Sequence, residues 1–217
     1  NSYGNGSAMR VSPVAWWYDS LEKVKREAIR TAMPTHNHEE GIKGAVSVAH
    51  AVFDLLNRKD KDSLISIGNE YYPDFLHHEY EEGRFDETCQ GVVPLCFYIV
   101  ANSTGFEDAI RNAISLGGDS DTIAAITGSL AEAYYGIPED LKETALSYLD
   151  ERLLNITERF EDKYLSIASA ATFPAPIAEI TVAAPVTASP PANTPLRDVT
   201  PSSSATTHPR RFVSSAS

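Results

Sequence analysis

The chain has 217 residues, 42% of them hydrophobic, which is enough for one sizeable core and is ordinary for a globular protein. Its formal net charge of −12 at pH 7 argues against binding to a nucleic-acid duplex, because such binding needs a basic surface. No apolar run approaches the ~20 residues that cross a bilayer, and no signal peptide opens the chain, so we expect a cytoplasmic monomer with no membrane partner.

The first part of the chain has apolar residues at helical spacing and no run that alternates with the period of a strand, which predicts an all-α fold. Residues 1–14 are rich in glycine and are predicted to form a loop. A first helix is predicted over residues 19–31 and a second over residues 38–56. Asn37 is expected to cap the second helix, with Glu40 three residues further on in a box-like arrangement.

The middle of the chain predicts one weak and one strongly apolar helix. The weak one covers residues 63–68, and the polar residues 69–91 are expected to be irregular. The almost continuous apolar run over 93–100 predicts a buried helix with Pro94 in its first turn, where a missing amide is tolerated. The remaining helices are predicted over residues 106–115, 120–135, 138–148 and 150–165.

Composition changes sharply near Ala171. Residues 171–217 hold eight of the thirteen prolines, and Ser, Thr and Ala fill most of the rest. A segment of this kind cannot bury enough apolar surface to offset the entropy lost on ordering. We therefore predict a folded domain over residues 1–168 and a disordered tail over residues 169–217.

The most informative stretch is the run Gly-Gly-Asp-Ser-Asp-Thr over residues 117–122, followed by an apolar helix. Glycines permit a tight turn, and the helix dipole favours carboxylates in a first turn. Asp119, Asp121 and Thr122 lie within one turn of each other, so three oxygen ligands can converge on a hard cation such as Mg²⁺. The simpler alternative is that Asp119 or Ser120 merely caps the helix.

Other metal and phosphate motifs fit this chain poorly. The positions that an EF-hand would fill with Asp or Asn, Gly and Glu are Ile123, Ala124 and Leu130. A P-loop is excluded because no Gly-Lys-Ser or Gly-Lys-Thr follows the glycines. A zinc site built on His36 and His38 would need further ligands, and no recognised spacing joins them to the other histidines and cysteines.

Residues 117–126, together with the Tyr-Gly-Ile-Pro of residues 135–138, resemble the C-terminal signature of the ADP-ribosylglycohydrolase family. In that family the two aspartates and the threonine ligate a pair of metal ions, usually Mg²⁺ and in some members Mn²⁺. The resemblance implies metal ligation by Asp119, Asp121 and Thr122, and a catalytic role for the two aspartates.

Two further segments support the resemblance. Residues 2–13 resemble the Gly-Asn-Gly loop that lines the ADP-ribose site of the family, and its backbone amides make a plausible anion nest. Residues 35–38 match the family's Thr-His box, which implies that His36 hydrogen-bonds the diphosphate at a helix N-terminus. On residues alone, the first segment is a simple turn and the second a helix cap or a surface pair. The implied ADP-ribose contacts of the loop are Ser2, Tyr3, Gly4, Asn5 and Gly6.

Both cysteines and one histidine are expected to be structural. Residues 88–94 resemble the loop before the family's long buried helix, where Cys89 packs rather than acting as a nucleophile. Cys89 and Cys96 are poorly placed for a mutual disulfide, because on one helix they point the same way. His50 lies on the apolar face of its helix and is expected to be a core histidine.

The resemblance also identifies a missing part. The family has an N-terminal Thr-Asp-Asp motif that supplies further metal ligands, and no Thr-Asp-Asp occurs in this chain. We therefore expect an N-terminally truncated helical bundle, with apolar surface exposed on the helix over 120–135. The resemblance implies a glycosidic hydrolase of ADP-ribosylated substrates, weakly active or inactive in this form. The alternatives are a module that binds ADP-ribose without cleaving it, and a plain helical scaffold.

Overall fold

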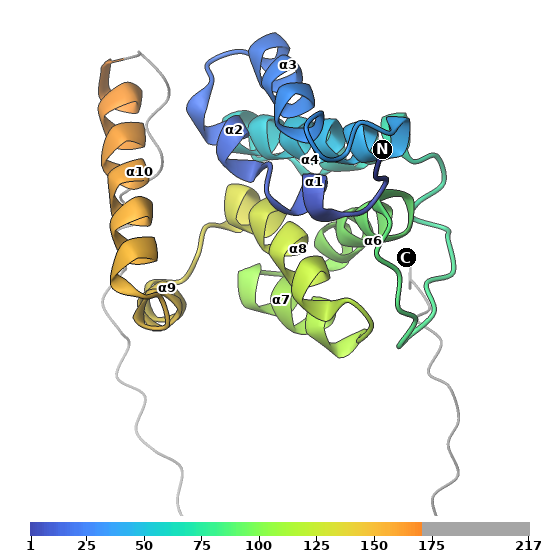
Figure 1. Ribbon diagram of the computed structural model, residues 1–217. Coiled ribbons are helices and arrows are strands. Elements are labelled where there is room, and N and C mark those ends of the chain that lie inside the picture. The colour runs from blue at the N-terminus through green and yellow to red at the C-terminus, as the bar shows by residue number, and fades with distance from the viewer. Residues whose placement is uncertain (171–217) are drawn as a thin grey trace, which may run out of the picture. The chain divides into compact units, whose positions relative to one another are not determined.

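The computed structural model describes residues 1–170, with side chains described as far as Tyr164. Within these residues the fold is all-α, as predicted, with no β-structure beyond a single bridge between Gly4 and Thr88 (Figure 1). The predicted tail lies outside the described residues, apart from 169 and 170. The helices are α1 (Gly6–Met9), α2 (Ser12–Trp17), α3 (Leu21–Ala32), α4 (Glu39–Arg58), α5 (Lys61–Tyr71), α6 (Cys89–Asn102), α7 (Phe106–Ser115), α8 (Ser120–Tyr135), α9 (Glu139–Ser147) and α10 (Glu151–Ala170).

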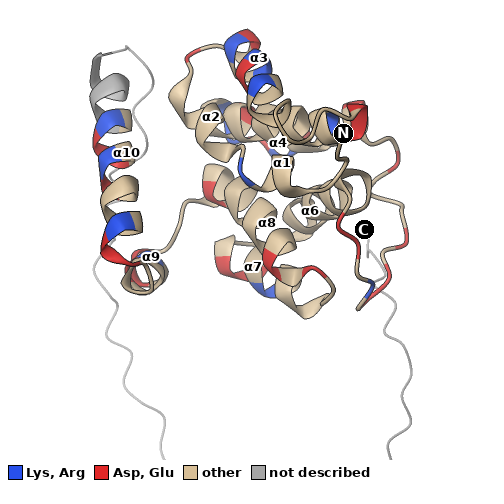
Figure 2. Cartoon of the chain, viewed as in Figure 1, with Lys and Arg blue, Asp and Glu red and all other residues tan. Residues whose placement is uncertain are grey.

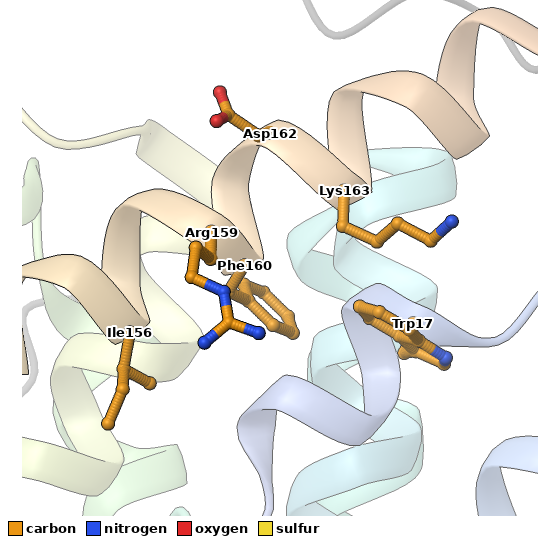
Figure 3. A pocket seen from close by; sticks show the side chains of 6 residues that line it. All are labelled: Trp17, Ile156, Arg159, Phe160, Asp162 and Lys163. Atoms are coloured by element: carbon orange, nitrogen blue, oxygen red, sulfur yellow. The ribbon is translucent and has the colours of Figure 1, made fainter.

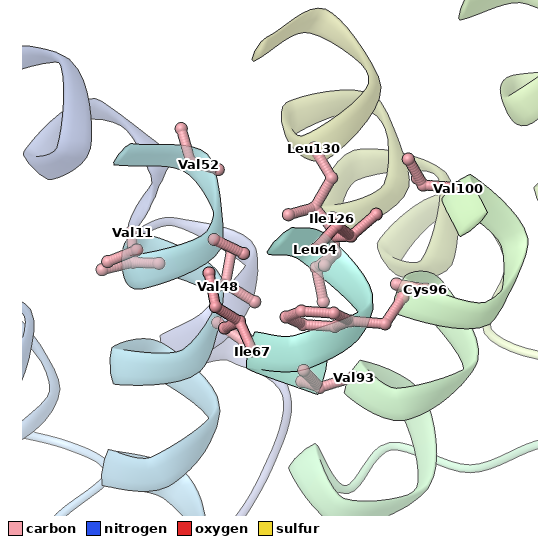
Figure 4. Packing of buried hydrophobic residues seen from close by; sticks show 14 of the residues in the cluster. Val11, Val48, Val52, Leu64, Ile67, Val93, Cys96, Val100, Ile126 and Leu130 are labelled. Atoms are coloured by element: carbon pink, nitrogen blue, oxygen red, sulfur yellow. The ribbon is translucent and has the colours of Figure 1, made fainter. Parts of the chain in front are cut away.

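Helix α4 lies at the centre of the domain and contacts α1, α2, α3, α5, α6 and α8. It can have so many neighbours because its middle, Gly44 to Val52, consists largely of Gly, Ala, Ser and Val, which let other helices approach closely. Apolar side chains from α4, α5, α6 and α8 interdigitate in one core (Figure 4). The helix therefore holds the N-terminal segment and the start of α8 against one common support.

The predicted N-terminal loop is wrong. Helices α1 and α2 occupy most of residues 6–17 and bury Ala8, Val11 and Ala15 in the core. These three residues follow helical spacing, which the glycine-rich opening masked. Both short helices pack against α4, so the residues before them are held on a folded base.

The starts of α4 and α6 also differ from the predictions. His38, not Asn37, caps α4, because its Nδ1 accepts a hydrogen bond from the Glu40 amide at 3.2 Å. Helix α6 begins at Cys89, where Thr88 Oγ1 accepts from the Gly91 amide at 3.1 Å. Pro94 is therefore inside the helix rather than in its first turn, and it deprives one carbonyl of its helical partner.

Helices α7 and α8 begin and end where the sequence predicted. The apolar residues Ile123, Ile126 and Leu130 of α8 are buried against its neighbours α4, α6 and α7. The expectation of exposed apolar surface on this helix is therefore wrong for these positions. Among the described residues, no helix is long and apolar enough to cross a membrane.

Candidate functional site

The aspartate motif and the Gly-Asn-Gly loop, which are far apart in sequence, meet through one side-chain contact. Asn5 Nδ2 donates a hydrogen bond to Asp119 Oδ2 at 2.6 Å. Asn5 is only 7% exposed, and Asp119 is half-buried immediately before α8. The Asp119 side chain makes no hydrogen bond that caps α8, so the simple capping alternative does not describe this residue.

Thr122 and Asp121 occupy the first turn of α8 in contrasting surroundings. The Thr122 side chain is buried, and its Oγ1 lies 3.8 Å from Met9 Sδ, a weak acceptor. Its hydroxyl oxygen therefore keeps its lone pairs for another partner. Asp121 is exposed. The three predicted metal ligands together offer hydroxyl and carboxylate oxygens, which is the donor chemistry that Mg²⁺ prefers.

The turn before Asp119 requires its two glycines. Gly117 and Gly118 have φ values of 70° and 68°, in the left-handed region. A Cβ on Gly118 would lie 2.3 Å from the carbonyl oxygen of Arg84, and the Gly83 amide donates to the Leu116 carbonyl at 2.7 Å. The segment around Gly83 thus closes directly onto the aspartate turn.

The segment that closes onto this turn is acidic. Between α5 and α6 it carries six carboxylates, and Arg84 is its one arginine (Figure 2). A concentration of negative charge beside the turn raises the local concentration of cations. This setting suits a divalent cation better than a bare anion. The six acidic residues are Asp74, Glu79, Glu81, Glu82, Asp86 and Glu87.

The Gly-Asn-Gly loop is fastened to the start of α6 by its own backbone. The Asn5 amide donates to the Glu87 carbonyl at 2.7 Å, and the Cys89 amide donates to the Tyr3 carbonyl at 2.9 Å. The Gly4 amide donates to Ser2 Oγ at 3.1 Å. The expected anion nest is therefore wrong for the amides of Gly4 and Asn5, because each already has a partner within the chain.

His36 lies against this loop. A Cβ on Gly6 would lie 3.2 Å from His36 Nε2, so glycine is the residue that lets the ring approach. On its other side, His36 Nδ1 lies 2.7 Å from Thr35 Oγ1, and Arg10 donates to the same hydroxyl oxygen at 2.8 Å. The hydroxyl has one hydrogen and two lone pairs, so beside the bond from Arg10 it either donates to Nδ1 or accepts from Nδ1–H, according to the ring tautomer.

The surroundings of His36 favour its neutral form over the charged imidazolium. Burial lowers the pKa of His36, and the positive charge of Arg10 lowers it further. The lowered pKa favours a neutral imidazole, whose Nε2 faces the Gly4–Gly6 loop. Tyr3 completes this side of the loop, being 49% exposed with its ring edge-on to His38 at 5.4 Å between centroids.

Cys89 and His50 are structural, as predicted. Cys89 is a buried free thiol whose Sγ donates to the Gly4 carbonyl at 3.1 Å, and burial raises its pKa. Cys96 is also free and buried. His50 is buried, with Nδ1 3.2 Å from the Tyr71 hydroxyl. Within residues 1–164, no group of three or more His, Cys, Asp and Glu is placed to hold a metal ion.

A cavity of about 610 Å³ lies elsewhere, between α2 and α10 (Figure 3). Trp17 and Phe160 stack across it with ring centroids 5.6 Å apart, and Ile156 lines it beside them. None of the predicted site residues lines this cavity.

Three residues next to the site were not predicted. Met9 contacts Thr122, Thr35 contacts His36, and Arg10 donates to Thr35. All three lie within the two segments that resemble the family, residues 2–13 and 35–38. Their closeness in sequence to the predicted site residues is the signal that could have identified them. Their partners could not be read from the sequence, because each contact joins different segments or depends on a side-chain rotamer.

Comparisons with known proteins identify the family of the chain. The ADP-ribosylglycohydrolase family model matches residues 1–169. ADP-ribosylhydrolase ARH3 of Bos taurus is 27% identical, with 70% of this chain and 56% of that protein covered. An ADP-ribosyl-(dinitrogen reductase) glycohydrolase of Rhodospirillum rubrum is 28% identical, with 76% and 57% covered. The chain thus spans about half the length of the curated relatives it matches.

A solved structure described as an ADP-ribosylglycohydrolase-related protein complex supports the same relationship. It superposes with a TM-score of 0.61 at 27% sequence identity, covering 76% of this chain and 59% of that one. The similarity therefore extends to the helical arrangement. The family match over residues 1–169 shows that the chain belongs to the ADP-ribosylglycohydrolase family.

Proposed function

We propose that the protein hydrolyses the glycosidic bond between ADP-ribose and a protein side chain or small molecule, in a metal-dependent reaction. The observation that carries the proposal is the hydrogen bond between Asn5 and Asp119, which brings the predicted nucleotide loop to the predicted metal motif. A nucleotide and a cation held there would be neighbours. Relatives named for hydrolysis of ADP-ribosyl bonds support this assignment.

In this proposal Asp119, Asp121 and Thr122 hold Mg²⁺, with Mn²⁺ as an alternative ion. The donors fit: Thr122 offers a buried hydroxyl whose contact is a weak thioether, and Asp121 offers an exposed carboxylate. When bound, such a cation polarises hydroxyl groups and lowers the pKa of water. The neutral imidazole of His36 donates a hydrogen bond to the diphosphate, and Tyr3 borders the same loop.

Three donors from one turn are too few to hold two cations tightly, because Mg²⁺ takes six ligands. We therefore propose that the 217-residue chain binds ADP-ribose but turns substrate over slowly. The second candidate, a module that binds ADP-ribose without cleaving it, is favoured by the absence of a Thr-Asp-Asp sequence from this chain.

Titration with ADP-ribose, with and without Mg²⁺, tests the proposal alongside an assay of ADP-ribosyl-arginine hydrolysis. Binding that tightens with Mg²⁺, with slow turnover, supports the hydrolase. Binding independent of Mg²⁺ and without turnover supports the binding module. Absence of binding contradicts both, and hydrolysis as fast as by the Rhodospirillum rubrum relative contradicts the expected weak activity.

Asp121→Ala is the variant that tests the metal site directly. We expect it to lower Mg²⁺ affinity by at least about tenfold, because a carboxylate ligand is lost. Asp140→Ala is the matched control, since Asp140 is also an exposed aspartate at the second residue of a helix, α9. Equal Mg²⁺ affinity in the two variants, measured by calorimetry, would remove Asp121 from the ligand set.

A further inference from the structure

We propose that Asn5 is a positioning residue for the Asp119 carboxylate rather than a ligand of the nucleotide, an inference that rests on the proposed metal site. The contact is specific in its chemistry. A carboxylate only accepts hydrogen bonds, so the amide nitrogen of Asn5 must be the end that faces Asp119. The Nδ2–Oδ2 distance of 2.6 Å is that of a short, charge-assisted bond.

The backbone of Asn5 is fixed on both sides, which makes its side chain a rigid support. Its amide donates to the Glu87 carbonyl at 2.7 Å, and its own carbonyl accepts from the Met9 amide at 2.9 Å. The side chain is 7% exposed, so little of it faces solvent or a ligand. The amide group is therefore held in place before any cation arrives.

Asp119 needs such a support because nothing in its own helix supplies one. It occupies the cap position of α8 without a side-chain bond to that helix, and the two preceding glycines leave the turn with no side chains to pack around it. With Oδ2 held by Asn5, rotation of the carboxylate is restricted, and Oδ1 remains for a cation. Partners that orient a ligand in this way typically contribute about 10–100-fold to metal affinity.

The competing interpretation is that the bond merely fastens α1 to α8. Metal affinity measured without nucleotide distinguishes the two, because a fastening role acts through stability alone. We would titrate the 217-residue chain and its variants with Mn²⁺ by calorimetry, checking each fold by circular dichroism. The variants are Asn5→Ala, the near-isosteric Asn5→Leu, Asp119→Ala, and Asn5→Ala combined with Asp119→Ala.

We expect Asn5→Ala and Asn5→Leu to weaken Mn²⁺ binding by about tenfold or more, and Asn5→Ala to have no further effect once Asp119 is alanine. The control is Asn102→Ala, in which an exposed asparagine loses a bond from Nδ2 to the Tyr98 carbonyl of 2.8 Å. It should bind Mn²⁺ like the parent chain. Unchanged affinity in both Asn5 variants would overturn the proposal.

A second measurement needs no Asn5 variant to fold. In the ¹⁵N-labelled chain, Mg²⁺ without nucleotide should shift the Asn5 side-chain amide resonances, and the shift should vanish in Asp119→Ala. A shift caused by ADP-ribose alone, with none from Mg²⁺, would show that Asn5 is a nucleotide ligand and overturn the proposal.

The two hypotheses can fail separately. If the parent chain binds Mn²⁺ in an Asn5-dependent way but hydrolyses no substrate, the positioning role stands and the proposed hydrolase fails. If the chain hydrolyses substrate and Asn5→Ala leaves Mn²⁺ affinity unchanged, the hydrolase stands and the positioning role fails. If the parent chain binds no Mn²⁺ or Mg²⁺, both the metal site and the positioning role are contradicted.

Discussion

Thr35 stands between Arg10 and His36, and its hydroxyl contacts both side chains. The hydroxyl oxygen accepts from Arg10 and forms a hydrogen bond with His36 Nδ1. Both links depend on a single atom. Thr35 is exposed, so its substitution should disturb this chain of hydrogen bonds without disturbing the core.

We expect Thr35→Val to weaken ADP-ribose binding about three- to tenfold at pH 7, because a typical hydrogen bond contributes about 0.5–1.5 kcal/mol. Thr35→Ser retains the hydroxyl and should bind like the parent chain. Thr144→Val is the control for a general effect of the substitution, since Thr144 is an exposed threonine on α9. Equal affinities of Thr35→Val and Thr35→Ser in calorimetry would show that the Thr35 hydroxyl does not act through His36.

At this scale the sequence identified the right segments but not the partners of their side chains. The Asn5–Asp119 contact joins residues 114 positions apart. The Asn5 side chain turns its nitrogen rather than its oxygen toward Asp119, because a carboxylate can only accept a hydrogen bond. The sequence likewise singled out His36, but the lowering of its pKa depends on burial and on Arg10. Motif order gave the candidate residues, whereas their hydrogen-bond partners required three-dimensional geometry.

Helix α4 and the start of α6 approach each other closely at Gly44. A Cβ on Gly44 would lie 2.4 Å from Cys89 Sγ and 2.8 Å from Cys89 Cβ. Neither atom can retreat easily, because Cys89 is buried and its Sγ is hydrogen-bonded to the loop at Gly4. Gly44 is therefore required for the approach that also anchors the nucleotide loop.

Gly44→Ala should lower the free energy of unfolding by about 1–3 kcal/mol, since overpacking a core costs this much. The control is Gly128→Ala in α8, also inside a helix, where a Cβ would lie 3.2 Å from the flexible end of Ile110. Both variants gain the helix propensity of alanine, about 1 kcal/mol. Urea unfolding measures the difference, and Gly44→Ala as stable as Gly128→Ala would contradict this packing argument.

The bounds of some helices can be predicted from the sequence alone, whereas those of others cannot. Helix α7 is preceded by Gly105 and α8 is followed by Gly136, and both helices were predicted with their observed bounds. Helices α1 and α2 were missed because each is very short and the glycine-rich opening masked their helical spacing, and their stability comes from burial against α4. Pro94 misplaced the start of α6, because its tolerance inside the helix depends on the surrounding packing.

On the scale of the domain, charged side chains on α8, α9 and α10 interact with one another. Glu132 lies on α8 and is half-buried, Lys142 lies on α9, and Glu161 on α10 pairs with Lys142 at 3.0 Å between Oε1 and Nζ. Burial raises the pKa of Glu132; the positive charge of Lys142 opposes this, and the negative charge of Glu161 adds to it. The ionisation of Glu132 should therefore affect stability.

The sign follows from proton counting. A carboxyl whose pKa is raised by folding holds more protons in the folded state at pH values above its ordinary pKa of 4.5, so its contribution to stability falls as the pH rises to the folded value and is constant beyond it. Glu132→Gln removes this dependence. We expect the variant to gain stability relative to the parent chain as the pH rises from 4.5.

Urea unfolding at a series of pH values between 4 and 8 measures this difference. Glu143→Gln, which neutralises an exposed carboxylate on α9, controls for the change in net charge. The stability of Glu132→Gln relative to Glu143→Gln should rise with pH above 4.5 and then level off. A difference that is constant with pH would show that Glu132 has the same pKa in the folded and unfolded states, and that burial between α8 and its neighbours imposes no electrostatic cost.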